Sequence, residues 1–141
     1  MKVLIDTNVL LDFLLEREPF KKDAEELFAA IDSGQIIGYV TATTLTDIFY
    51  IARKHTRSIE LAREAVSSTL VSMTICPVNR NVLEEAFASG LTDFEDAVQI
   101  YSAIAQNLDA IVTRDAKGFL SSSIPVYSVR QLLEQLQNVK N

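Results

Sequence analysis

Short apolar segments alternate along the chain with longer segments in which apolar residues recur every three or four positions. The short segments, which predict buried strands, cover residues 3–5, 36–41, 73–78, 110–113 and 126–127. The longer segments, which predict helices with one apolar face, cover residues 9–15, 20–33, about 43–54, 59–71, 82–89, 93–105 and the chain after Ser128. Strands separated by helices are typical of a parallel sheet covered on both faces. The pattern therefore predicts an α/β fold, a three-layer α/β/α sandwich.

Several polar residues mark where these elements begin and end. Asn81 and Ser128 are expected to cap helices, and Thr92 with Glu95 has the Thr-x-x-Glu spacing of a capping box. Pro77 has no backbone N–H to donate, so the strand at residues 73–78 is expected at an edge of the sheet, or to end there.

The composition supports one hydrophobic core and limits the chemistry. The chain has 141 residues, of which 48% are hydrophobic, enough for a core without disulfides or zinc. A single cysteine, Cys76, and a single histidine, His55, exclude a Cys/His zinc site and a Ser-His-Asp relay. No uncharged run approaches the roughly 20 residues that span a bilayer. We therefore expect a soluble, cytoplasmic protein without a membrane segment, whose metal sites would be built from oxygen.

The net charge places a condition on any contact with nucleic acid. With 13 basic and 19 acidic residues the formal net charge is −6, so the surface as a whole should repel a phosphate backbone. Residues 36–82, however, hold five basic residues against three acidic ones. Our hypothesis is that Arg53, Lys54 and Arg57 contact phosphate. The alternative is that they only complement the dipole at the end of their helix.

Four aspartates fall at the ends of predicted elements. Asp6 follows the first strand, Asp115 follows the strand that ends at Thr113, and Asp47 and Asp96 lie near helix starts. In a parallel α/β sheet these ends share one edge, where ligands bind. Carboxylates that meet there raise one another's pKa unless a cation compensates them, and oxygen ligands favour Mg²⁺ or Mn²⁺. The alternative for each acid is a capping role at a helix start or turn.

The same stretches carry a resemblance to a known family. They are Val3-Leu4-Ile5-Asp6-Thr7-Asn8-Val9-Leu10-Leu11-Asp12, Thr44-Leu45-Thr46-Asp47, Asp93-Phe94-Glu95-Asp96-Ala97 and Ile111-Val112-Thr113-Arg114-Asp115. In this order, and over nearly the whole chain, they resemble the PIN-domain family and are similar to the ribonuclease toxins of bacterial type II toxin–antitoxin pairs.

The resemblance implies a single PIN-like domain over residues 1–141 with a mostly parallel central sheet. It implies Asp6, Asp47, Asp96 and Asp115 as catalytic residues, with Mg²⁺ or Mn²⁺ held by Asp6, Asp96 and Asp115 and with Asp93 as an auxiliary ligand or a helix cap. The family usually has glutamate where this chain has Asp47, so a water-bridged or orienting role is expected there.

The neighbouring polar residues are expected to support these acids. Thr7 or Asn8 would orient Asp6 or a metal-bound water, and Thr113 would do the same for Asp115. The alternative is that all three satisfy the backbone of turns.

The activity that the resemblance implies is metal-dependent endonucleolytic hydrolysis of single-stranded RNA, leaving a 5′-phosphate and a 3′-hydroxyl. It also implies a homodimer and a cognate antitoxin whose C-terminal peptide places an Arg or Lys against the carboxylates. Phe13, Leu14 and Phe20 would serve such contacts or pack in the core. The alternative function is a catalytically silent PIN-like module that binds a protein partner.

Two other phosphate-handling families fit less well. Phosphoaspartate enzymes of the haloacid-dehalogenase type need a second aspartate two residues after the first, where this chain has Asn8. Receiver domains need paired acids after the first strand, where Asp6-Thr7 supplies only one, and a lysine after a different strand from the one that Lys117 follows.

Overall fold

A computed structural model describes the backbone of residues 1–140 and the side chains of residues 1–138. Five parallel strands form one central sheet in the order β3-β2-β1-β4-β5. The strands are β1 (Lys2–Ile5), β2 (Ile37–Thr41), β3 (Thr74–Cys76), β4 (Ala110–Val112) and β5 (Val126–Tyr127). The helices are α1 (Thr7–Leu14), α2 (Lys21–Asp32), α3 (Ala42–Thr56), α4 (Ile59–Ser72), α5 (Arg80–Ala88), α6 (Phe94–Ala105) and α7 (Val129–Lys140), with a short 3₁₀ helix, η1 (Ala116–Phe119), between β4 and β5.

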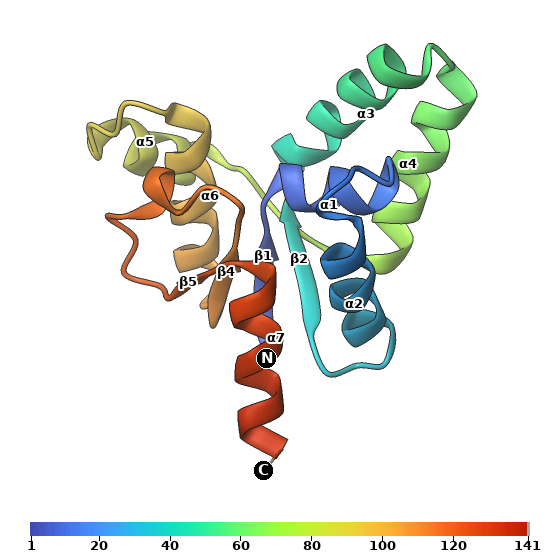
Figure 1. Cartoon of the computed structure of the whole chain (residues 1–141). Coiled ribbons are helices and arrows are strands. Elements are labelled where there is room, and N and C mark those ends of the chain that lie inside the picture. Colours follow the sequence, from blue (N-terminus) through green and yellow to red (C-terminus); the bar gives the residue numbers. More distant parts are fainter. Residues whose placement is uncertain (141) are drawn as a thin grey trace.

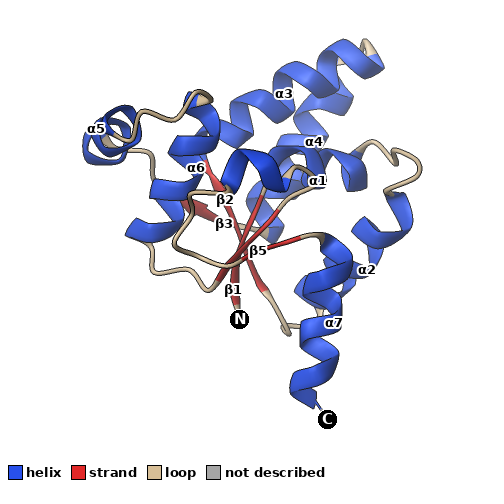
Figure 2. Cartoon of the chain, turned by 60° about the vertical axis from the view of Figure 1, so that its left-hand side comes forward, coloured by secondary structure: helices blue, strands red, loops and turns tan. Residues whose placement is uncertain are grey.

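The side chains of the central strand divide the core into two layers. Val3 and Ile5 pack with residues of α1, α2, α3, α4 and α7, whereas Leu4 packs with residues of α6 and with Phe119. Figure 1 shows α5 and α6 on one side of the sheet and α1 to α4 on the other, and the turned view in Figure 2 shows the strands enclosed between the helices. The predicted α/β/α sandwich is confirmed, and β3, which ends at Cys76 before Pro77, is an edge strand as expected.

The strand order positions the ligand-binding edge. From β1 the chain moves outward to β2 and β3, then crosses to the other side of β1 and continues through β4 and β5. The carboxyl ends of β1 and β4 therefore lie side by side at the point where the strand order reverses. Asp6 and Asp115 follow these two strand ends, so the topology alone brings them to one place.

Two predicted helix starts are wrong, and both differ by one or two residues. Asn79, not Asn81, caps α5, because its side-chain oxygen accepts the N–H of Val82 at 3.0 Å. Asp93, not Thr92, caps α6 by accepting the N–H of Asp96 at 3.0 Å. The Thr92–Glu95 capping box therefore does not form, and the Glu95 carboxylate remains available for the site described below. The cap predicted at Ser128 is confirmed by its bond from the N–H of Gln131.

Within residues 1–140, no helix combines the length and the apolar character that crossing a membrane requires.

Candidate active site

An acidic cleft of about 320 Å³ opens at the carboxyl edge of the sheet. It gathers residues from β1–α1, α3, the start of α6 and the segment after β4. Its lining consists of Asp6, Thr7, Asn8, Asp47, Ile51, Asp93, Glu95, Asp96, Asp115 and Phe119. All five acids singled out in the sequence thus lie in one cleft, together with Glu95, which the sequence pattern assigned to a capping box.

Asp6 is the most firmly held of these acids. Its side chain is only 8% exposed, and each carboxylate oxygen accepts one hydrogen bond. The Gln99 side-chain amide donates to Oδ1 at 2.9 Å, and the Thr113 hydroxyl donates to Oδ2 at 2.7 Å. Donors on both oxygens fix the plane of the carboxylate.

The polar neighbours expected to support the acids are arranged differently from the prediction. The Thr7 hydroxyl bonds to that of Thr44 at 2.9 Å, and Asn8 accepts hydrogen bonds from Arg17, so neither orients Asp6 directly. For Thr113 the alternative holds at Asp115, because its oxygen accepts the backbone N–H of Asp115 at 3.0 Å and so satisfies the turn after β4. Since the same hydroxyl donates to Asp6, Thr113 links the ends of β1 and β4.

Asp96 occupies space that only a glycine leaves free. A Cβ atom built on Gly118 of η1 would overlap Oδ2 of Asp96. Burial, followed by the charges of Asp93, Asp6 and Asp115, raises the pKa of Asp96 to about 6. Asp96 therefore lies where its negative charge is disfavoured in the absence of a compensating cation.

Asp47 of α3 and Glu95 of α6 form a pair of carboxyl groups in the cleft. Although the Glu95 side chain is exposed overall, burial raises the pKa of its carboxyl to about 7, and a hydrogen bond with Asp47 and the charges of Asp47, Asp93 and Asp6 act in the same direction. The Glu95 carboxyl therefore changes its protonation near neutral pH.

The donor set suits a hard divalent cation, although it is not closed around one. Only carboxylate, hydroxyl and amide oxygens line the polar part of the cleft, which favours Mg²⁺ or Mn²⁺ over zinc. Among the side chains that the structure describes, no three Asp, Glu, His or Cys residues are arranged to hold an ion. Asp93 is turned to cap α6, so it can act as a ligand only if its side chain turns further into the cleft.

The raised pKa of Asp96 predicts a pH-dependent stability difference in metal-free protein. From pH 4 to pH 7 the unfolded carboxyl ionises at its usual pKa of about 4, while folded Asp96 retains its proton up to about pH 6. The unfolded state then binds fewer protons, so this group destabilises the fold as pH rises. We expect Asp96→Asn to be more stable than the wild type by roughly 1–2 kcal/mol at pH 7, after solvent screening, and by much less at pH 4.

Urea denaturation of both proteins in EDTA at pH 4, 5.5 and 7 measures this difference. Asp109→Asn, at an exposed acid far from the cleft, is the control. A difference between Asp96→Asn and the wild type that does not grow with pH would contradict the prediction.

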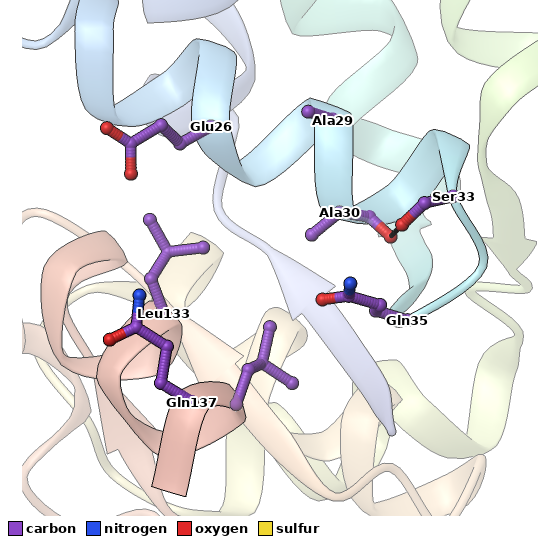
Figure 3. Close-up of a pocket in the computed structure, with 8 residues that line it drawn as sticks. Glu26, Ala29, Ala30, Ser33, Gln35, Leu133 and Gln137 are labelled. Carbon is purple, nitrogen blue, oxygen red and sulfur yellow. Dashed lines mark hydrogen bonds between the residues drawn. The ribbon is translucent and has the colours of Figure 1, made fainter. Parts of the chain in front are cut away.

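One further hollow and the single thiol lack this chemistry. A hollow of about 280 Å³ lies between α2 and α7, where Figure 3 shows Leu133 and Gln137 opposite Ala30 and Gln35. Its one carboxylate, Glu26, is paired with Arg130 at 3.0 Å. Burial raises the pKa of the Cys76 thiol to about 11, which makes it a poor nucleophile. The acidic cleft is therefore the candidate active site.

Solved structures of low sequence identity share the fold. VapC20 of Mycobacterium tuberculosis, described as a Sarcin-Ricin loop cleaving toxin, has a TM-score of 0.70 at 13% identity, covering 84% of this chain and 94% of that one. VapBC-1 from nontypeable Haemophilus influenzae has a TM-score of 0.69 at 15% identity (92% and 99% covered). A toxin–antitoxin complex from Klebsiella pneumoniae has a TM-score of 0.65 at 21% identity (90% and 97% covered). Among curated proteins, none matches the chain significantly.

The family is shown by the sequence itself. The sequence profile described as PIN domain matches residues 2–117, which include every acid of the cleft. The expectation drawn from the four sequence stretches is confirmed, and the chain belongs to the PIN-domain family.

Proposed function

We propose that the protein is a metal-dependent endoribonuclease that hydrolyses phosphodiester bonds of single-stranded RNA with Mg²⁺ or Mn²⁺. One observation carries the proposal: Asp6, Asp47, Asp96 and Asp115, from four separate segments, line a single cleft at the switch point of the sheet. Membership of the PIN-domain family and the likeness to structures described as toxins support it.

In this proposal Asp6, Asp96 and Asp115 hold the cation, with Asp93 as an auxiliary ligand. A divalent ion held there would supply a more acidic water as the nucleophile for in-line attack on a phosphodiester phosphorus. The water oxygen would bond to phosphorus while the bond to the 3′-oxygen breaks, and the leaving 3′-oxygen would take a proton from solvent, which leaves a 5′-phosphate and a 3′-hydroxyl.

The chain's own groups position the reactants and move the proton. Gln99 and Thr113 hold Asp6 in its orientation. Asp47 orients the attacking water, and its partner Glu95, with a pKa of about 7, is suited to accept the proton that the water loses. Asp47, which stands where the family usually has the longer glutamate, thus has an orienting role in this proposal.

We further propose that the protein is the cytoplasmic toxin of a toxin–antitoxin pair and forms a homodimer. Four of the similar structures are described as toxin–antitoxin or VapBC structures, two of them bound to DNA. An antitoxin side chain such as Arg or Lys would neutralise the acidic cleft by pairing with its carboxylates. Of the aromatic residues considered for partner contacts, Phe13 stacks on Phe28 in the core, with ring centroids 4.0 Å apart, whereas Phe20 is 38% exposed.

The test of the activity is cleavage of labelled single-stranded RNA by the purified protein in parallel reactions with Mn²⁺, Mg²⁺ or EDTA. We expect cleavage with either ion, none with EDTA, and products that carry a 5′-phosphate. Calorimetry with Mn²⁺ alone accompanies the assay. Absence of both cleavage and ion uptake would overturn the proposal and favour the alternative, a silent protein-interaction module.

The position of Lys54 on α3 predicts where RNA leaves the cleft. Asp47 and Ile51 line the cleft, and Lys54, seven residues after Asp47, continues the same side of the helix about 10 Å further along. Tyr50, 65% exposed, lies beside this line, whereas Arg53 points to a different side. Within residues 1–138, Lys54 makes no ion pair. Arg57 lies outside α3, as its left-handed C-cap residue. Within α3 the phosphate-binding hypothesis therefore narrows to Lys54.

We expect Lys54→Gln to weaken RNA binding at low salt and to reduce the slope of log affinity against log salt by about 0.7 to 1, as for the loss of one phosphate contact. Fluorescence anisotropy with the Asp96→Asn protein, which leaves the RNA uncut, measures both. Arg53→Gln removes the same charge one residue away and is the matched control. Equal slopes for the two variants would contradict a specific role for Lys54.

A further inference from the structure

Gln99 lies below the cleft, outside the set of acids that line it. It is on α6, one turn after Asp96, and its side chain is 1% exposed. Of its two polar atoms, Nε2 donates to Asp6 at 2.9 Å, and Oε1 has no hydrogen-bond partner among the described residues. A buried amide oxygen without a partner costs stability, so its presence needs a physical reason.

The reason lies in the Asp6 carboxylate that the Gln99 amide faces. If the amide were flipped, Oε1 would point at this carboxylate, and the two negatively polarised oxygen groups would repel each other. The observed orientation leaves Oε1 without a partner and gives an N–H to the carboxylate, so the electrostatics of Asp6 determine how Gln99 is placed. Packing alone would be served equally well by a leucine or methionine.

The hydrogen bonds to Asp6 come from opposite sides of the cleft floor. Gln99 approaches Oδ1 from α6, while Thr113 approaches Oδ2 from the end of β4. Each carboxylate oxygen has a second lone-pair site, and with one site on each oxygen used by the protein, the remaining sites stay free for a ligand. With Thr113 alone, the carboxylate would retain rotation about its Cβ–Cγ bond.

We propose that Gln99 is a positioning residue, which together with Thr113 fixes the Asp6 carboxylate so that its free lone pairs face a divalent cation in the cleft. This inference rests on the proposed metal-dependent function. Gln99 does not touch the cation or the RNA; it acts through Asp6 alone.

The test compares Mn²⁺ binding by calorimetry in the full-length wild type, Gln99→Met and Ser102→Ala. Gln99→Met keeps the length and volume of the side chain and removes the donor. We expect it to lower Mn²⁺ affinity roughly 10–100-fold, as is usual when a hydrogen-bond partner of a metal ligand is lost. Ser102, three residues further along α6, is fully buried and its hydroxyl also has no partner within the described chain. Its replacement by alanine disturbs the same helix without touching Asp6 and should leave the affinity unchanged.

A second readout does not depend on metal. In nitrogen-15 spectra of the metal-free protein, the side-chain amide protons of Gln99 should exchange slowly, and Asp6→Asn should shift their resonances. Mn²⁺ affinity of Gln99→Met within twofold of the wild type would overturn the inference while leaving the nuclease proposal intact. If the wild type takes up no Mn²⁺, the nuclease proposal fails, and a Gln99 amide that is insensitive to Asp6→Asn would overturn the inference separately.

Discussion

Asp96→Asn is expected to reduce metal-dependent RNA cleavage by at least roughly 10³-fold while the protein remains folded. The substitution keeps the shape of the side chain and removes one of the charges that compensate a divalent cation. It also removes a carboxyl whose pKa is raised in metal-free protein by burial and then by the charges of Asp93, Asp6 and Asp115. Loss of activity together with an unchanged or increased stability at neutral pH is the combination expected of a functional carboxylate, because a structural carboxylate would lose stability when replaced.

Single-turnover cleavage with saturating Mn²⁺ measures the effect, and urea denaturation of the same samples measures the folding. Asp109→Asn removes an acid that lies outside the cleft, where its carboxylate accepts the N–H of Lys2 at 2.7 Å. We expect this control to retain activity within about twofold. Cleavage by Asp96→Asn at a rate close to that of the wild type would remove Asp96 from the mechanism.

Gly118→Ala tests the same carboxylate without changing it. The new methyl group would overlap Asp96 Oδ2, and since this atom is the end of a side chain, the carboxylate can turn away with little cost to folding. We expect weaker Mn²⁺ binding and slower cleavage with nearly unchanged stability. Gly118 has an ordinary backbone conformation, so backbone strain does not contribute to the result.

The location of the aspartates was predictable because it follows from chain order and strand direction. Asp6 and Asp115 come directly after apolar strand segments, and parallel strands bring their carboxyl ends to one edge. Asp47 lies in the second turn of α3 and Asp96 in the first turn of α6, and both helices start at that edge. The apolar segments and the positions of the aspartates relative to them can be read directly from the sequence.

The remaining parts of the cleft depend on contacts that spacing does not encode. Glu95 fits a capping box equally well, and only the capture of the α6 N-terminus by Asp93 leaves it free to face Asp47. Gln99 follows Asp96 by three residues, the spacing at which two side chains share a helix face, and this was the one available signal. The contact between Gly118 and Asp96 joins residues far apart in the chain and leaves no local pattern.

An ion-pair network around the buried Asp12 of α1 supports the segment after β4. Asp12 is 1% exposed; its Oδ1 accepts a hydrogen bond from Arg17 Nε, and its Oδ2 forms an ion pair with Arg114 Nε, both at 2.9 Å. The Arg114 guanidinium also stacks over the Phe20 ring, 4.0 Å from its centroid. Because Arg114 lies between Thr113 and Asp115, Asp12 ties α1 to the segment that carries one wall of the cleft.

Asp12→Ala is expected to lower the free energy of unfolding by roughly 2–3 kcal/mol, less than the cost of breaking a fully buried ion pair, because the Arg17 and Arg114 side chains are 28% and 31% exposed. Burial raises the pKa of Asp12 and the two arginines oppose this rise, so the carboxylate already carries a desolvation cost that only the arginines offset. Without Asp12, both guanidinium groups lose their anionic partner and a cavity opens beneath α1. Urea denaturation measures the loss.

The matched control is Glu84→Ala, because Glu84 forms an ion pair with Arg80 at 2.7 Å on the exposed surface of α5. That pair is solvated and flexible, so its loss should cost less than about 0.5 kcal/mol. Asp12→Asn preserves the volume of the side chain but not its charge. Its loss in free energy of unfolding should lie between those of Asp12→Ala and Glu84→Ala, which separates the electrostatic part of the loss from the part due to the cavity. If Asp12→Ala loses no more free energy of unfolding than Glu84→Ala, the burial of Asp12 does not strengthen its ion pairs, and the prediction is wrong.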